Sequence, residues 1–314
     1  MPIRMLSDDD VRRHLDPDEL LEALAKGFQA LSAGAVVAPP RNGVDVENGF
    51  LLGMMAHAPN HPIGVKLVSV FHGNHAIGLP GHLALIALFD EHTGAPIAVM
   101  NGTWVTAIRT AAGAALSTRL LARPDARTLA IVGAGVQGES HLQMLSRVRA
   151  FQDVRIASLR LEDAERVAAT DPRARALASA EHAVEDADVV CLCTTSSAPV
   201  VQRAWLAPGT HVTSVGYMPP GSEVAPDVIQ HARLFVETRG AFAPPPAGCV
   251  ELAGADPHSA AELGEVLMGR RPGRVSDSEL TLYKSMGHAM EDLVAARLAY
   301  DRAMAAGAGT SLTL

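Results

Sequence analysis

Three glycines stand between an apolar run and a helical pattern in the middle of the chain. The stretch "IVGAGVQGESHLQML" (131–145) spaces them as Gly133, Gly135 and Gly138. Such a turn lets the backbone approach a ligand closely, and the helix that follows offers free N–H groups and its positive dipole end to a pyrophosphate. The spacing alone is weak evidence, because any strand–turn–helix can collect glycines. Since alternating strands and helices follow, we favour a dinucleotide-binding turn over a purely structural one.

The end of the next apolar run bears on which dinucleotide is bound. An acidic residue about 20 residues after the turn binds the ribose hydroxyls of NAD. Here that position is Ser158, and Arg160 lies close behind it. A serine with a nearby arginine tolerates a 2′-phosphate, so we predict that NADP(H) is favoured and that NAD(H) is possible. The alternative is that Arg160 only caps a solvent-facing turn.

Three basic residues lie in apolar or stiff surroundings. Lys66 stands in "IGVKLVSVF" (63–71), Arg109 is the only charge in "VTAIRTAAGAAL" (105–116), and Arg41 follows "APP". A buried charge is costly unless an anion meets it. We expect all three to bind a substrate carboxylate, with the charge of Arg109 left unmet in the ligand-free protein. Two structural alternatives stay open: a lysine on an edge strand, and an arginine paired with an internal Asp or Glu.

Histidines are concentrated in the first part of the chain, at His57, His61, His72, His75 and His82. The segment "HGNH" (72–75) has a spacing that suits chelation. No carboxylate or cysteine completes a set of ligands there, so we expect no metal site. No G-x-S-x-G elbow or other nucleophile motif stands out.

The charge balance argues against several kinds of partner. The net charge is −8, and no basic run occurs. We therefore expect no binding to nucleic acid or to an anionic membrane surface. The longest apolar runs, such as "LALIALF" (83–89), are far shorter than the ~18 residues that a membrane span needs. Three cysteines do not form a disulfide framework, so we predict a cytoplasmic protein with reduced thiols.

The first part of the chain predicts an antiparallel α+β unit. A helical pattern covers 16–31, and extended segments follow at 49–59, 63–71 and 82–100. The last segment contains "DEHTG" between two apolar runs, which is a hairpin signal. An alanine-rich helix over 104–122 ends where "RPDAR" breaks the pattern.

From Thr128 onward strands and helices alternate, which predicts a parallel sheet with crossover helices. Strands are expected at 128–133, 154–158, 186–195, 210–216 and 233–237, with helices at 137–149 and 162–169. The stretch 280–306 is interpreted as one final helix. We predict an α/β fold in which a Rossmann-type doubly wound parallel sheet spans 122–282. A second α+β domain for substrate binding and dimerisation combines 1–121 with 283–314.

Several stretches together resemble the ornithine cyclodeaminase/μ-crystallin family, in order and from about Arg41 to Ala296. They are "GVKLVSVF", "GLPGHLALIALFDEHTGAPIAVMNGTWVTAIRTAAGAAL", "IVGAGVQGESHLQML", "SVGYMPPGSEV" and "YKSMGHAMEDLVAA". The resemblance implies a two-part subunit with a Rossmann domain and an α+β domain that makes a homodimer.

The resemblance also implies roles for individual residues. The basic residues that bind the substrate carboxylate in this family correspond to Arg41, Lys66 and Arg109, of which Lys66 and Arg109 are the catalytic candidates. Met286 would face the substrate. The cofactor contacts correspond to Gly133, Gly135, Val136, Gln137, Gly138, Ser158, Arg160, Thr194, Val212, Val215 and Ser285.

Departures from the family pattern bear on the chemistry. True ornithine cyclodeaminases carry an aspartate in a "G-D-C-P-G-K" stretch, where it accepts a proton from the substrate. Here the segment is "GYMPPGS" (216–222), and Met218 stands at the aspartate position near the substrate. Ser222 replaces the lysine of that stretch, and Gly81 replaces the threonine of the family's "GLPT". A methionine neither takes a proton nor pairs with an ammonium group.

We therefore expect an NAD(P)H-dependent oxidoreductase whose partner is a small amino or imino acid. The favoured reaction reduces a cyclic ketimine beside a carboxylate, such as Δ1-pyrroline-2-carboxylate or Δ1-piperideine-2-carboxylate. Ornithine cyclodeaminase, an NAD-dependent lyase, is the second candidate, and an alanine-dehydrogenase-like enzyme is the third. A binder without catalysis is disfavoured, because the glycine turn and all three cations are intact. Lys66, His82 or water would supply the proton.

Overall fold

The computed structural model describes residues 2–313, and the chain divides into two compact units. Unit 1 combines residues 1–109 with 288–314, and unit 2 comprises 110–287. These bounds differ from the expected division at 121 and 283: the first boundary falls inside one helix, α3 (Gly102–Leu121), and the second falls after the last strand of unit 2.

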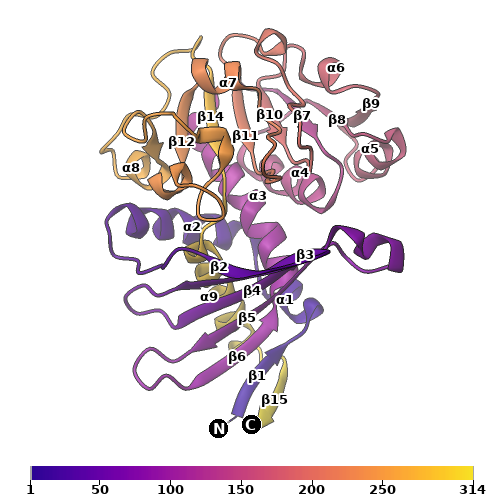
Figure 1. The fold of residues 1–314 in the computed structure, drawn as a ribbon. Coiled ribbons are helices and arrows are strands. Elements are labelled where there is room, and N and C mark those ends of the chain that lie inside the picture. The colour runs from indigo at the N-terminus through magenta and orange to yellow at the C-terminus, as the bar shows by residue number, and fades with distance from the viewer. Residues whose placement is uncertain (1, 314) are drawn as a thin grey trace. The chain divides into compact units, whose positions relative to one another are not determined.

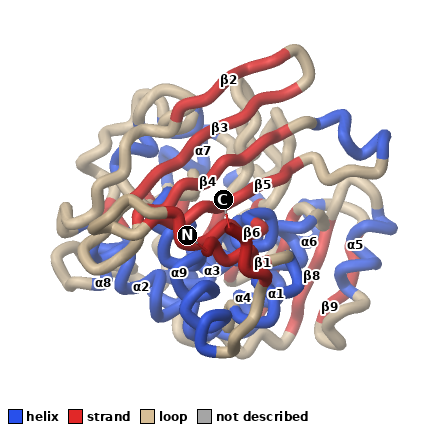
Figure 2. Tube along the Cα trace, turned by 90° about the horizontal axis from the view of Figure 1, so that it is seen from below, coloured by secondary structure: helices blue, strands red, loops and turns tan. Residues whose placement is uncertain are grey.

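Unit 1 is built on a mixed sheet of seven strands in the order β15-β1-β6-β5-β4-β3-β2 (Figure 1). In chain order its elements are β1 (Pro2–Leu6), α1 (Asp8–His14), α2 (Pro17–Ser32), β2 (Asn42–Val46), β3 (Gly49–Ala56), β4 (Ile63–Val70), η1 (His72–Ile77), β5 (His82–Phe89), β6 (Pro96–Asn101), the first part of α3, α9 (Ala289–Ala305) and β15 (Thr310–Thr313). Strands β2 to β5 run side by side (Figure 2), and neighbouring strands from β2 to β6 are antiparallel.

Local sequence explains the elements of unit 1 that were predicted. Asp16 caps α2 by accepting hydrogen bonds from the N–H groups of Asp18 and Glu19, both at 2.9 Å. In the hairpin between β5 and β6, Asp90 Oδ1 accepts from the N–H of Thr93 at 2.8 Å, and Gly94 adopts a φ of +69° that favours glycine. The predicted helix and hairpin are therefore present.

Helix α9 packs closely against strand β4 and helix α2 because glycines face it. A Cβ atom on Gly64 of β4 would lie 3.0 Å from Leu293 Cδ1, and one on Gly27 of α2 would lie 2.3 Å from Met290 Sδ. Along β4 the buried side alternates as Gly64, Lys66 and Val68. Lys66 therefore points to the side of the sheet that α9 covers.

Unit 2 contains an all-parallel sheet of eight strands in the order β13-β12-β14-β11-β10-β7-β8-β9. After α3 its elements are β7 (Thr128–Val132), α4 (Val136–Val148), β8 (Asp153–Ala157), α5 (Leu161–Ala168), β9 (Ala174–Leu177), α6 (Ala180–Val184), β10 (Val189–Leu192), η2 (Arg203–Trp205), β11 (His211–Ser214), α7 (Pro226–His231), β12 (Arg233–Val236), η3 (Arg239–Phe242), η4 (Val250–Leu252), β13 (Ala261–Glu262), α8 (Leu263–Leu267) and β14 (Thr281–Lys284). Its core is a cluster of small and branched apolar residues to which β7, β8, β10, β11, β12 and β14, helices such as α6 and α7, and several loops contribute.

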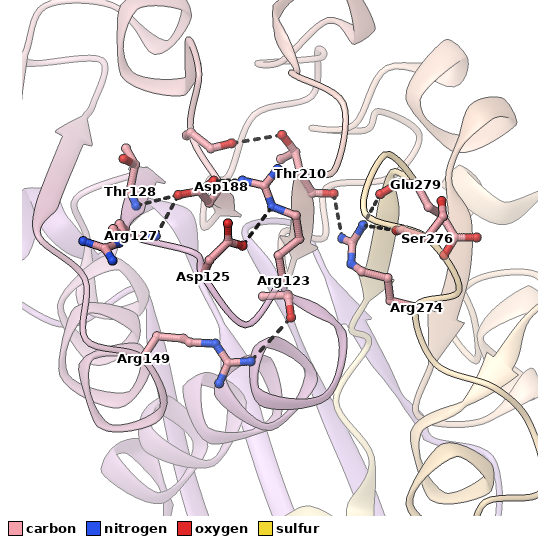
Figure 3. Close-up of polar contacts among 12 residues, drawn as sticks. Arg123, Asp125, Arg127, Thr128, Arg149, Asp188, Thr210, Arg274, Ser276 and Glu279 are labelled. Atoms are coloured by element: carbon pink, nitrogen blue, oxygen red, sulfur yellow. Dashed lines mark hydrogen bonds and ion pairs between the residues drawn. The ribbon is translucent and has the colours of Figure 1, made fainter.

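A polar network holds the edge of this sheet where its strands begin (Figure 3). Asp188, just before β10, accepts hydrogen bonds from the N–H groups of Arg127 at 2.7 Å and Thr128 at 2.9 Å, and it pairs with Arg123. Arg274 donates to Thr281 Oγ1 at 2.9 Å. The contacts of Asp188 fix the amino ends of β7 and β10 to one another, and Arg274 also donates to the carbonyl of Thr210, which ties the start of β14 to that of β11. We interpret this edge as structural.

The interpretation of 280–306 as one helix is wrong in its first part. Residues 281–284 form β14, which lies between β11 and β12 in the parallel sheet. Gly287 then takes a φ of +68°, and His288 caps α9. The apolar run Leu280–Lys284 suits a buried strand as well as a helix. It forms a strand because its backbone can hydrogen-bond to β11 on one side and β12 on the other, which is a property of the tertiary fold. Strands β1, β2, β9, β13 and β15, which are short or lie near sheet edges, were also missed.

Across residues 2–313, no helix has both the length and the apolar content needed to cross a membrane.

Candidate active site

The glycine turn of unit 2 has the geometry that its spacing predicts. Gly133 follows β7 with a φ of +108°, and a Cβ there would lie 2.4 Å from the carbonyl oxygen of Cys193. A Cβ on Gly138 would lie 2.1 Å from the carbonyl oxygen of Gly133. The first glycine thus allows a tight turn against the neighbouring strand end, and the last lets α4 pack against the turn.

The middle glycine faces open space. Gly135 is the N-cap of α4, where it offers no side chain to cap the helix, and a Cβ there would meet no atom within 4 Å. Val136 beside it is 61% exposed, and Gln137 is partly buried. The N–H groups of the first turn of this 13-residue helix therefore face an accessible cradle, which fits a pyrophosphate. Of the two interpretations of the glycines, this geometry favours dinucleotide binding.

The residues expected at the ribose lie at the end of the next strand. Ser158 directly follows β8 and is half-buried, whereas Arg160 is the exposed N-cap of α5. The Arg160 guanidinium lies with Nε 3.2 Å from Asp163 Oδ2 and 3.7 Å from Glu162 Oε2. Ion pairs this exposed are worth roughly 0–1 kcal/mol, so they compete only weakly with a phosphate. Both roles of Arg160, in phosphate binding and in the turn, stay open, and the preference for NADP(H) stays a prediction.

A buried glutamate that sequence reasoning missed organises the carboxyl ends of β10 and β11. Glu223 is 1% exposed. Its Oε2 accepts from the N–H and the hydroxyl of Thr194, at 2.9 and 2.7 Å, while its Oε1 accepts from Ser214 Oγ at 2.8 Å and the N–H of Gly216 at 2.7 Å. Thr194, a predicted cofactor contact, is thereby fixed in place.

The other predicted residues of this edge differ in accessibility. Val215 lies just past the end of β11 and is partly buried, whereas Val212 lies inside that strand and packs in the core. Met218 lies in the following loop, where its carbonyl accepts a hydrogen bond from the N–H of Gly221 at 2.8 Å. Val215 and Met218 can therefore face a ligand more readily than Val212.

Two further buried charges at this edge support predicted residues. Glu237, at the end of β12, accepts hydrogen bonds at Oε1 from Ser285 Oγ at 2.7 Å and from the N–H of Met286 at 2.9 Å. Lys284, at the end of β14, donates to the carbonyl of Gly216 at 2.6 Å and pairs with Glu251 at 3.0 Å. The sequence did contain a pattern that could have pointed to Glu237 and Lys284, because the apolar segments "RLFVE" and "TLYK" each end with a charged residue.

Unit 1 brings Lys66 and Arg109 together on two acidic residues of α9. Lys66 Nζ lies 2.7 Å from Asp292 Oδ2. Arg109 Nε lies 3.0 Å from Asp292 Oδ1, and its Nη1 lies 3.3 Å from Glu291 Oε2. All four side chains are at least 95% buried. We call these four residues the charge cluster.

The charge cluster corrects one expectation and removes one of the open alternatives. The charge of Arg109 is not unmet, because Asp292 and Glu291 meet it inside the protein. Lys66 is not on an edge strand, because β4 lies between β3 and β5. The alternative of an arginine paired with an internal carboxylate is therefore present in the ligand-free chain.

Burial shapes the protonation of the charge cluster. Burial lowers the pKa of Lys66 to about 8, although Asp292 opposes this shift. Burial also acts to raise the pKa of Asp292, but the charges of Arg109 and Lys66 outweigh it and hold that pKa below its usual value. For His82, burial together with Lys66 and Arg109 lowers the pKa to about 4. At neutral pH His82 is therefore uncharged, whereas Lys66 loses its proton at a pH only slightly above neutral.

The first turn of α9 explains why two carboxylates are tolerated there. Glu291 Oε1 accepts from the N–H of His288 at 2.7 Å, and His288 Nδ1 in turn accepts from the N–H of Met290 at 3.1 Å. This capping box fixes the turn, and the positive end of the helix dipole stabilises anions within it.

The remaining candidates of unit 1 lie elsewhere. Arg41 is partly buried just before β2, and its role stays a prediction. His72 begins η1, and His57 pairs with Glu91 at 3.0 Å. The side chain of His75 lies outside the described part of the structure. Within that part, no three His, Cys, Asp or Glu side chains gather as a possible metal site.

Comparison with known proteins agrees with the fold. The model of the ornithine cyclodeaminase/mu-crystallin family matches residues 3–307. Ketimine reductase mu-crystallin of Mus musculus is 38% identical over 305 residues, which are 94% of this chain and 96% of the relative.

Two solved structures are similar over the whole chain. The structure of Thermococcus litoralis Δ1-pyrroline-2-carboxylate reductase in complex with NADH and L-proline has a TM-score of 0.94 and 32% identity, and it covers 99% of this chain and 100% of its own. An archaeal alanine dehydrogenase dimer with bound NAD has a TM-score of 0.91 and 28% identity, with 100% of each chain covered.

The fold and the glycine turn define an α/β protein with a Rossmann-type parallel sheet and a second domain, as predicted. The chain belongs to the ornithine cyclodeaminase/mu-crystallin family. The predicted enzyme class, an NAD(P)-dependent oxidoreductase that acts on C=N or CH–NH bonds, is confirmed.

The glycine turn yields a matched pair of variants. Gly135→Ala adds a methyl group to open space, so we expect an unchanged free energy of unfolding and an affinity for NAD(P)H that falls about tenfold or more. Gly138→Ala forces Cβ against the backbone, so we expect a loss of stability of about 1–3 kcal/mol. Denaturant unfolding and fluorescence titration measure the two effects, and a Gly135→Ala protein with normal cofactor affinity would contradict the cradle.

The charge cluster predicts that Arg109→Ala lowers stability. Removing one member of a buried ion pair leaves its partners uncompensated, at a cost of about 3–5 kcal/mol. Arg297→Ala is the control on α9, since its pair with Asp301 is exposed and is expected to contribute less than about 1 kcal/mol. Chemical denaturation compares the two. Equal stabilities for the two variants would show that the cluster is not coupled to folding.

Proposed function

We propose that this chain is an NAD(P)H-dependent reductase of a cyclic ketimine beside a carboxylate, such as Δ1-pyrroline-2-carboxylate or Δ1-piperideine-2-carboxylate. One observation carries the proposal beyond the family: the chain keeps the glycine turn and the buried Lys66–Arg109 pair but has Met218 where proton acceptance from an amino substrate would need a carboxylate. The relatives named as ketimine and pyrroline-2-carboxylate reductases support the same reaction.

The charge balance of the cluster favours this class of substrate. Lys66 and Arg109 are formally balanced by Glu291 and Asp292. Adding a monoanion to a buried neutral cluster leaves an uncompensated charge, which is costly. A protonated cyclic ketimine carries one carboxylate and one iminium group, so it binds without changing the net charge. A 2-oxo acid, which carries a single negative charge at neutral pH, lacks this balance.

The residues of this chain have distinct parts in the proposed reaction. The Gly133–Gly138 turn and the start of α4 would hold the cofactor's pyrophosphate, with Thr194, Val215 and Ser285 along the same strand edge. Bound NAD(P)H would supply a hydride to the imine carbon. Lys66 and Arg109 would bind and orient the carboxylate, which is mainly a contribution of proximity.

Protonation distinguishes the candidate proton donors. Because the pKa of Lys66 is lowered to about 8, most of this group is protonated at neutral pH yet can release its proton. His82, with a pKa lowered to about 4, carries no ionisable proton to give there. Hydride transfer to the iminium leaves a neutral ring amine, and Lys66 is favoured over His82 as the group that gives this nitrogen a proton, with water as the alternative.

A substrate panel tests the proposed function. The protein is mixed with NADPH or NADH and with each of Δ1-pyrroline-2-carboxylate, Δ1-piperideine-2-carboxylate and pyruvate plus ammonia, and loss of reduced-cofactor absorbance is followed. L-Ornithine is tested separately with NAD+, and the formation of proline is measured. Rapid oxidation with the ketimines is expected. Faster turnover with pyruvate plus ammonia, or conversion of L-ornithine to proline without net cofactor oxidation, would overturn the proposal in favour of the other two activities.

The NADP(H) preference predicts the effect of Ser158→Asp. A new carboxylate beside the ribose repels a 2′-phosphate, so the KM for NADPH should rise about tenfold or more, while the KM for NADH changes little. Ser158→Asn is the control, because it has a similar size and no charge. Steady-state kinetics with both cofactors measures the difference, and an equal rise for NADPH and NADH would contradict the assignment.

The exposed face of the unit 1 sheet supports a homodimer. Strand register places apolar side chains side by side on the face opposite to α9, and these are Val44, Leu51, Met55, Leu67, Leu83 and Leu85. Each is at least 37% exposed, and contiguous apolar surface of this kind marks an interface. We expect light scattering at micromolar concentration to give twice the mass of one chain, whereas a stable monomer would refute the dimer.

A further inference from the structure

We propose that Asp292 is a positioning residue for imine reduction, which holds the Lys66 ammonium and the Arg109 guanidinium together as the pair that receives the substrate. This inference rests on the proposed function and adds a residue to it. No step of the reaction is assigned to Asp292 itself, because it acts through its two cationic neighbours.

The geometry of the carboxylate carries the inference. Asp292 Oδ2 lies 2.7 Å from Lys66 Nζ, and its Oδ1 lies 3.0 Å from Arg109 Nε. Each oxygen therefore engages a different cation, one from strand β4 and one from helix α3. Two buried cations repel each other in a medium of low dielectric constant, so the shared carboxylate is what allows them to lie close together.

Glu291, the neighbour of Asp292 in the sequence, makes different contacts and therefore serves as the comparison for its role. Its Oε2 contacts Arg109 Nη1 at 3.3 Å, and its Oε1 accepts from the N–H of His288 in the helix cap. Asp292 contacts both catalytic candidates, whereas Glu291 combines a contact to Arg109 with the capping of α9. The two carboxylates are adjacent in sequence and equally buried, so they form a matched pair for experiment.

The charged and titratable groups near Lys66 come from three elements besides its own. They are Arg109 of α3, Glu291 and Asp292 of α9, and His82 of β5. Arg109 lowers the pKa of Lys66, whereas Asp292 raises it more strongly than Glu291 does. Loss of the Asp292 charge should therefore move the titration of Lys66 to lower pH.

The first experiment compares Asp292→Asn with Glu291→Gln in the dimeric holoenzyme, with Δ1-pyrroline-2-carboxylate as substrate. For Asp292→Asn we expect kcat to fall roughly tenfold to a hundredfold, because a displaced site residue has effects of this order. The alkaline limb of the kcat/KM profile should move to lower pH, and the KM for the cofactor should stay unchanged. For Glu291→Gln the alkaline limb should move less, because Glu291 raises the pKa of Lys66 less strongly than Asp292 does. A folded Asp292→Asn enzyme with the wild-type pH profile would overturn the proposal.

A second variant covers the case in which Asp292→Asn fails to fold. Asp292→Glu keeps the charge beside Lys66 but displaces it by one methylene group. We expect its alkaline limb to lie at the wild-type pH while its kcat stays below that of the wild type. A kcat equal to the wild type in this variant would show that the position of the carboxylate does not matter, which contradicts a positioning role.

An NMR titration separates this proposal from the proposed function. The chain has only three lysines, Lys26, Lys66 and Lys284, so lysine-labelled protein gives three side-chain signals, and Lys66→Arg assigns the one of interest. Asp292→Asn should lower the titration midpoint of Lys66 and leave that of Lys26 in place. If this shift occurs but the wild type reduces no ketimine, the proposed function fails while the pairing stands. If the wild type is active and Lys66 does not shift, the role of Asp292 fails alone.

Discussion

Balance of buried charge is the constraint on which unit 1 depends. Lys66 and Arg109 lie inside an apolar unit, where an unpaired cation would be prohibitively costly. Glu291 and Asp292 in the first turn of α9 form ion pairs with these two cations. The capping box holds this turn in place, and the helix dipole stabilises its carboxylates. Gly64 and Gly27 allow α9 to approach closely enough for these contacts. The same arrangement that stabilises the unit thus presents two cations in one place.

In unit 2, charged side chains with hydrogen-bonding partners lie at both edges of the sheet, where they have different effects. Where the strands begin, Asp188 and Arg274 tie backbone and side chains of neighbouring strands together (Figure 3). Where the strands end, Glu223 and Glu237 instead hold loop residues such as Thr194 and Ser285, which were expected to contact the cofactor. Parallel α/β sheets bind ligands at the carboxyl ends of their strands. The buried carboxylates therefore shape loops on the edge that the glycine turn also occupies.

Much of the fold and part of the site could be predicted from local patterns. The glycine turn, the alternating strands and helices, and the selection of Lys66 and Arg109 as buried cations all rest on neighbours in the sequence. The partner of Arg109 could not be found in this way, because Asp292 is separated from Arg109 by 183 positions in the sequence. Strand β14 was interpreted as helix because its place between β11 and β12 is a tertiary property. Glu223 was overlooked because its donors come from separate strand ends.

The central claim is that the charge cluster receives a substrate carboxylate and is not only an internal ion-pair network. The most direct test is the titration of the Lys66 side-chain NMR signal in wild-type protein saturated with NADPH, with and without L-proline, a zwitterionic product analogue that carries one carboxylate and one ammonium group and is not reduced further. A carboxylate bound beside Lys66 stabilises its charged form, so the titration midpoint should rise when the analogue binds. An unchanged Lys66 midpoint under saturating analogue would show that the carboxylate binds elsewhere and would contradict the account.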